Sequence, residues 1–308
     1  MNRVWYLIGV LLLLAGLVHL GVFVVDGGPW EGAVSWRKPF TFGVSFGLSV
    51  LTLTWVSQFV RLRARSLWLG AFAAASAMEV ALITVQAWRG VPSHFNMETA
   101  VDAAVARTLA AGGGVLVAVA IAMTVAAFRA GPDLAPSMRL AVRAGFATLL
   151  TALVFGAVMI ARGVVEVVTG NQQLAYTVAA ALKPAHAVFM HGVLLLLALA
   201  WLLARALPSE ELRVRLVRLA VWTYAGFATA VSALALAGVT VVSPSTASML
   251  CAGAISGLAI AVLALGRFGR WPSHSRLGRW PSDSRLGQRP SEDPSHEETT
   301  GSLQKDRR

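Results

Sequence analysis

Residues 4–25, VWYLIGVLLLLAGLVHLGVFVV, decide the fold class of this chain. A helix needs roughly 20 apolar residues to cross the hydrocarbon core of a bilayer. This stretch is long enough, and it contains no Asp, Glu, Lys or Arg. Because no small-x-small cleavage site precedes Asp26, we expect a retained first transmembrane helix and not a signal peptide.

Seven further stretches are apolar enough to cross a membrane. The sequence therefore predicts an all-α integral membrane protein, with an eight-transmembrane-helix bundle in residues 1–266. The predicted spans lie near residues 4–25, 40–60, 67–88, 104–128, 140–161, 184–204, 217–242 and 246–266.

The composition of the whole chain agrees with this fold class. Of the 308 residues, 56% are hydrophobic and 13% are charged, and the mean hydropathy is +0.67. Soluble chains are about one quarter charged, which excludes a soluble enzyme. The net charge of +11 follows from the orientation of the loops, so nucleic acid is not an expected partner. The single cysteine, Cys251, allows no disulfide within the chain.

The loops between the predicted spans differ in charge. On one side, together with both termini, they hold 20 Lys and Arg, whereas the other side holds six. Cytoplasmic loops carry the excess of positive charge. The Ala-, Val- and Arg-rich text is typical of a bacterial coding sequence. We therefore expect the bacterial plasma membrane, with both termini cytoplasmic.

A faint internal repeat relates the two halves of the predicted bundle. Lys38-Pro39 opens the second span and Lys183-Pro184 opens the sixth, and Gly47 and Gly192 follow at equal distances. The offset of 145 residues superimposes spans one to four on spans five to eight, a 4+4 parallel repeat of the kind that transporters contain. The alternative is coincidence, since Lys-Pro is a common helix start.

Small residues at helical spacing indicate close contacts between helices. Gly43-x-x-x-Gly47 and Gly253-x-x-x-Gly257 would let two backbones approach one another. The helices in contact are either neighbours in one bundle or the faces of a homo-oligomer.

Residues 267–308 differ from the rest. A nine-residue unit, Arg270 to Gly278, recurs from Arg279 to Gly287, with Pro and Gly in each copy. Such a segment cannot build a core, so we expect a disordered, basic, cytoplasmic tail. It either lies on anionic lipid or has no role.

Ionisable residues within the predicted spans mark the candidate site, because each is costly in a bilayer unless it is paired or hydrated. His19, Glu79 and His191 lie about 9, 13 and 10 Å below the predicted outer ends of their helices, at 1.5 Å per residue. Glu79 must be protonated, paired or hydrated at this depth, and a salt-bridge partner such as His191 or His19 would serve.

The outer loops add aromatic and charged residues to this depth. The sequence predicts a polar pocket, open to the outer face, that binds or moves a small solute and is coupled to protons through Glu79. The residues assigned to the pocket are Trp36, Arg37, Glu79, Trp88, Arg89, His94, Arg162 and His191.

Three alternatives remain open. His19 and His191 could be the axial ligands of a b-type haem in a bundle interior. His94, Glu98 and Asp102 follow at four-residue spacing and could hold a divalent cation, although acidic residues also favour a helix N-terminus that Ser93 or Asn96 would cap. The chain could also be a non-catalytic scaffold or assembly partner. No motif of common ATPases, zinc proteases or serine hydrolases is present.

Overall fold

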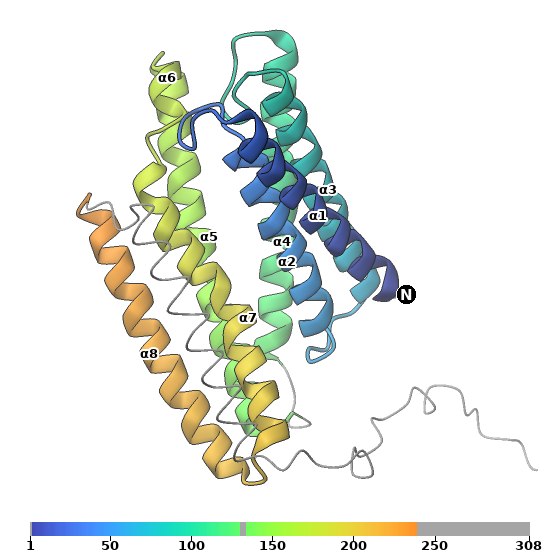
Figure 1. Cartoon of the computed structure of the whole chain (residues 1–308). Coiled ribbons are helices and arrows are strands. Elements are labelled where there is room, and N and C mark those ends of the chain that lie inside the picture. The colour runs from blue at the N-terminus through green and yellow to red at the C-terminus, as the bar shows by residue number, and fades with distance from the viewer. Residues whose placement is uncertain (1, 130–133, 239–308) are drawn as a thin grey trace, which may run out of the picture. The chain divides into compact units, whose positions relative to one another are not determined.

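The computed structural model describes residues 2–129 and 134–238, all within one compact unit. These residues form helices and no strands (Figure 1). The elements are α1 (Asn2–Asp26), α2 (Arg37–Val56), α3 (Arg65–Trp88), α4 (Ala100–Phe128), α5 (Pro136–Val168), α6 (Gln172–Ala175), the 3₁₀ turn η1 (Ala180–Leu182), α7 (Lys183–Ala206) and α8 (Glu210–Leu236).

Seven segments of the described chain are long and apolar enough to cross a membrane. They correspond to the first seven predicted spans, although α8 begins seven residues before the predicted 217–242 and is described to Leu236. The predicted eighth span, 246–266, and the predicted tail, 267–308, lie outside the described residues. Large apolar side chains such as Val24 and Val25 are exposed on α1, as lipid-facing residues should be.

The closest helix contact lies between α1 and α2. A Cβ atom at Gly43 would be 2.6 Å from the Cα of Gly16, and one at Gly47 would be 2.8 Å from the carbonyl oxygen of Gly9. These glycines let the two backbones touch, as predicted for packing within one bundle. The Gly43–Gly47 face is thus occupied by α1 of the same chain, whereas Gly253 and Gly257 lie outside the described residues.

The helices alternate in direction, so α1, α3 and α5 end where α2, α4 and α7 begin. We call this region, marked by the first turn of α2, the Lys38 end; it is uppermost in Figure 1. The charge distribution predicts that it faces outward.

The loop 89–99 between α3 and α4 is held at the Lys38 end by a later part of the chain. The side chain of Gln172 donates to the carbonyl oxygen of Phe95, and the ring of Phe95 fills the space that Gly163 leaves on α5. Phe95 has a φ of 62°, which is rare for a bulky residue and persists where the surroundings impose it. The loop is therefore fixed against α5 and α6.

Candidate solute-binding site

A buried carboxylate and an imidazole meet below the Lys38 end. Glu79, on α3, is 3% exposed, and its Oε2 lies 3.8 Å from Nε2 of His94. His94 comes from loop 89–99, which folds back far enough to reach a residue nine positions before the end of α3. The predicted partners of Glu79 were His191 and His19; the residue beside it is His94.

Helix α4 makes room for this pair with a glycine. A Cβ atom at Gly112 would lie 3.0 Å from Oε1 of Glu79 and 2.5 Å from the terminal methyl of Met78. Any larger residue would displace the carboxylate. Gly112 is the member of the Gly112–Gly114 run that serves packing here, since Gly113 and Gly114 face open space.

His94 also contacts a hydroxyl at the edge of a small cavity. Nδ1 of His94 lies 3.1 Å from Oγ of Ser93, which is 2% exposed. Ser93, Ser35 and Lys38 line a cavity of about 10 Å³ together with Ala33, Val34, Ile83, Ala87 and Val91. That space is at the lower limit for one water molecule. The hydroxyl, the imidazole and the carboxylate thus form a row from the cavity into the bundle.

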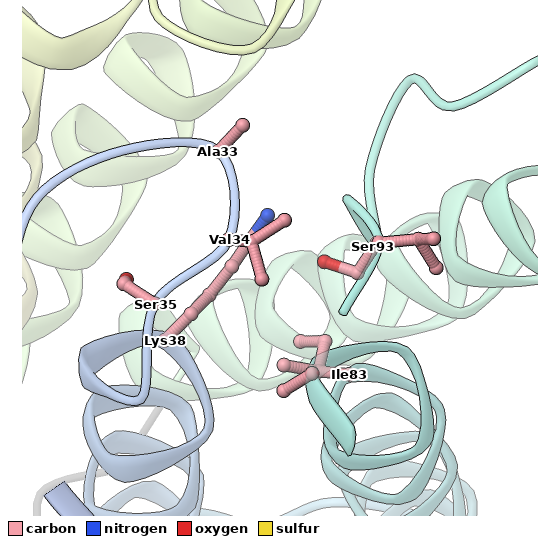
Figure 2. A pocket seen from close by; sticks show the side chains of 8 residues that line it. Ala33, Val34, Ser35, Lys38, Ile83 and Ser93 are labelled. Atoms are coloured by element: carbon pink, nitrogen blue, oxygen red, sulfur yellow. The ribbon is translucent and has the colours of Figure 1, made fainter. Parts of the chain in front are cut away.

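Two lysines supply positive charge around this row. Lys38, in the first turn of α2, extends along Val34 toward the gap that Ser93 faces (Figure 2). Lys183 begins α7 and is close enough for its charge to act on both Lys38 and His94. Within residues 2–129 and 134–238, Lys38 has no carboxylate oxygen within 4.0 Å. The Lys-Pro pairs of the faint repeat thus begin two helices at the same end of the bundle (Figure 1).

The neighbouring Arg37 is neutralised locally. Its guanidinium lies 2.6 Å from Oε1 of Glu31, in the loop between α1 and α2. Glu31 also acts electrostatically on Lys183. Glu31 is the one carboxylate that the loop 27–36 contributes near Arg37, Lys38 and Lys183.

The pKa of His94 is held well below its usual range, chiefly by burial and then by the charges of Lys38 and Lys183. Histidine in an unfolded chain titrates near pH 6.5. The folded imidazole stays neutral where the unfolded one takes up a proton, so stability is complete above about pH 6.5 and falls below it. We expect wild type to lose about 1 kcal/mol more than His94→Asn between pH 7 and 5.5. Unfolding in mixed micelles at each pH measures this difference, and parallel curves would contradict it.

A second polar group joins α3 to α4 at the same end. Asp102 is 2% exposed, and its Oδ1 accepts from Arg89 at 2.7 Å and from Gln86 at 2.9 Å. Its Oδ2 accepts from the hydroxyl of Thr99 at 2.6 Å, and Thr99 caps α4 by accepting from the backbone N–H of Asp102. The helix cap is therefore Thr99, not Ser93 or Asn96. Arg89 belongs to this structural network and not to the cavity lining.

Aromatic rings cover the side of the site that faces α1. Nε1 of Trp88 donates to Nε2 of His19 at 3.3 Å, and the Trp36 and Trp88 rings lie 5.0 Å apart. The ring of Trp36 also stacks on His19, with 6.2 Å between centroids. Both ring nitrogens of His19 therefore have hydrogen-bond partners, since Nδ1 lies 2.7 Å from the carbonyl oxygen of Ala15.

The structure does not bring the two proposed haem ligands together. His191 is exposed on α7 and contacts the carbonyl oxygen of Ala187 in its own helix. His19 is packed among tryptophans on α1, and the structure gives no contact between these two described histidines. Arg162 also lies apart, beside Glu166 and Val178 at a groove near the C-terminal end of α5. His191 and Arg162 thus do not join the predicted pocket.

The proposed metal ligands are separated in the same way. His94 faces Glu79, Asp102 is bound to Arg89, and exposed Glu98 is 3.5 Å from the hydroxyl of Tyr176. No group of three or more His, Cys, Asp or Glu side chains in the described parts of the chain could hold a metal ion. The four-residue spacing does not place these three side chains on one helix face, because helix α4 begins only at Ala100.

Sequence reasoning assigned neither Lys38, Lys183 nor Ser93 to the site. The recurrence of Lys-Pro was a usable signal for the lysines, but it was interpreted as a trace of an internal repeat or as a helix start and not as part of a site. Nothing in the sequence marked Ser93, whose place depends on the fold of loop 89–99.

The seven apolar helices and the buried polar row define a polytopic α-helical membrane protein. Searches against family models, curated proteins and solved structures found no match to this chain. Function must therefore be inferred from the site itself.

Proposed function

We propose that this protein is a secondary transporter that binds a small solute at the Lys38 end and couples its movement to a proton held by Glu79 and His94. The observation that carries the proposal is the row of Ser93, His94 and Glu79, which leads from a cavity to a carboxylate buried among membrane helices. Ionisable residues in such positions commonly belong to proton relays of pumps and transporters.

The row has the chemistry that proton coupling requires. A carboxylate in a bilayer needs a proton, a cation or water. Within the described residues, His94 is the one cationic or titratable partner within 4.0 Å of Glu79. A proton can therefore reside on either side chain, and Ser93 connects the imidazole to the cavity.

The packing of the helices supports the transporter class. Helix α1 packs on α2 as α5 packs on α7, α3 packs on α2 as α8 packs on α7, and α1 touches α3 as α5 touches α8. These pairs follow the offset seen in the sequence, since α2 begins at Arg37 and α7 at Lys183. The parallel repeat and eight spans belong to the proposal, because the last predicted span is outside the described residues. Transporters bind substrate where such repeats meet.

Glu79→Gln tests proton coupling, because an amide cannot carry the proton. Proteoliposomes containing a pH-sensitive dye would be exposed to acetate, phosphate, glucose and choline in turn. We expect at least one probe to change the internal pH with wild type, and this change to fall at least about tenfold with Glu79→Gln, the lower range for losing a general acid or base. Glu166→Gln, a partly exposed carboxyl at the same end that accepts from the side chain of Asn171, is the matched control. No response to any probe, or equal responses of wild type and Glu79→Gln, would contradict the proposal.

A further inference from the structure

We propose that the solute is an anion whose carboxylate or phosphate group binds between Lys38 and Lys183 beside Ser93, and that this binding brings a proton to His94. This inference rests on the proposed function and names the class of its solute. It concerns the loops 27–36 and 89–99 and the starts of α2 and α7, none of which contains Glu79.

The charges around the cavity favour an anion. Lys38 lines the cavity and has no carboxylate oxygen within 4.0 Å in the described parts of the chain. Lys183 acts on it by repulsion, and Arg37 is paired with Glu31. Bringing two ammonium groups together is unfavourable unless negative charge joins them. A bound oxyanion would supply that charge.

The uncharged groups at the cavity are suited to an oxyanion as well. The Ser93 hydroxyl can donate to a carboxylate or phosphate oxygen, and an ammonium group offers three donors. The first turn of α2, which holds Lys38, adds the positive end of a helix dipole, which favours anions. The remaining lining is small and apolar, which would exclude water around the charged group.

The cavity is too small for a solute in this structure, since it admits about one water molecule. Residues 33–35 form part of its wall, and the segment 27–36 to which they belong contains Gly27, Gly28 and Gly32, with φ of 70°, 93° and 125°. Glycine adopts these angles freely, so the segment can change conformation at little cost. Movement of residues 33–35 away from Ser93 would open the cavity to the Lys38 end (Figure 2).

Binding of an anion would alter the proton affinity of the row. The charges facing His94 are those of Lys38 from α2, Lys183 from α7 and Glu79 from α3. The two lysines help to keep the His94 pKa low. A bound anion offsets them, so the imidazole, with Glu79 at 3.8 Å, can accept a proton. Anion and proton therefore enter together, and each increases the affinity for the other.

Calorimetry on the full chain in phosphatidylcholine nanodiscs tests this inference, with acetate and inorganic phosphate as probes. We expect at least one probe to bind wild type, and at least about tenfold weaker binding to Lys38→Gln and Lys183→Gln, since each removes a charge partner of the anion. Arg107→Gln, an exposed cation on α4, is the matched control. Lys183 is exposed at a helix start, so its variant should fold even if the Lys38 variant does not.

Repeating the titration in two buffers of different protonation enthalpy measures proton uptake. Wild type should take up protons on binding, and His94→Asn should bind the anion with less uptake. Failure of both probes to bind wild type would overturn the inference, as would equal affinities of wild type and both lysine variants. Binding confined to phosphatidylglycerol in the nanodisc would also overturn it, because the ligand would then be a lipid headgroup.

The outcomes separate this inference from the proposed function. In one outcome, anion binding is weaker in both lysine variants, but Glu79→Gln takes up as many protons on binding as wild type. That result would support the anion site and contradict proton coupling through Glu79. In the other outcome, glucose or choline drives proton flux, and no anion binding that depends on the lysines is found. That result would support the proposed transporter function and contradict an anionic solute.

Discussion

Gly16→Val is expected to leave little folded protein in the membrane. A Cβ atom at this position would lie 2.7 Å from the backbone nitrogen of Val44 and 2.8 Å from the carbonyl oxygen of Phe40. Both are backbone atoms of α2, so no rotamer change can relieve the overlap. Overpacking of a well-packed interior costs about 1–3 kcal/mol and occasionally more. We expect about 3 kcal/mol here, because α1 and α2 would have to separate.

Gly21→Val provides the matched control in the same helix. No atom lies within 4 Å of a Cβ atom at Gly21. Yield of monodisperse protein in detergent and the melting midpoint would be compared for the two variants. Near-normal yield and melting of Gly16→Val would show that the contact between α1 and α2 is looser than described.

Asp102→Ala should lower the free energy of unfolding by about 2 kcal/mol, in the range for hydrogen bonds to charged groups. The carboxylate accepts from Arg89, Gln86 and Thr99, and Gln86 is fully buried. Removing it leaves Gln86 without its acceptor at Asp102. The loss stays below that of a fully buried ion pair because the Arg89 side chain is 39% exposed and can be hydrated.

Glu31→Ala is the comparison, because Glu31 is 68% exposed beside Arg37 and exposed ion pairs contribute about 0–1 kcal/mol. Unfolding in mixed micelles would measure both variants against wild type. Equal small losses would indicate that the network between α3 and α4 contributes no more than a surface pair.

The helices were predictable from the sequence because hydropathy depends on the residues themselves. Seven of the predicted spans correspond to long apolar helices in the described chain, but the ends of these helices were less predictable, above all those of α5. Its 33 residues extend to about 50 Å at 1.5 Å per residue. The prediction placed this span at 140–161. The apolar stretch of the sequence indicates only the part of the helix expected within lipid. The helix itself continues where its later turns pack against other residues, as Gly163 does against Phe95.

The partner of Glu79 was not predictable by counting depth along helices. That method considers residues within spans, and it selected His19 and His191. His94 reaches Glu79 because Phe95 adopts a left-handed conformation and its ring packs against Gly163. Such a contact between residues 68 positions apart leaves no periodic trace in the sequence.

The anchoring of loop 89–99 sets an order for biosynthesis. Gln172 and Gly163, which hold Phe95, leave the ribosome some 70 residues after it. A nascent chain that has inserted α1 to α4 therefore lacks the residues that fix His94 over Glu79. Chains are made at about 5–20 residues per second, so this interval lasts several seconds. During that time the Glu79 carboxyl group has to be protonated, hydrated or shielded by the insertion machinery. Premature termination after α4 would therefore yield an inserted product without a formed site.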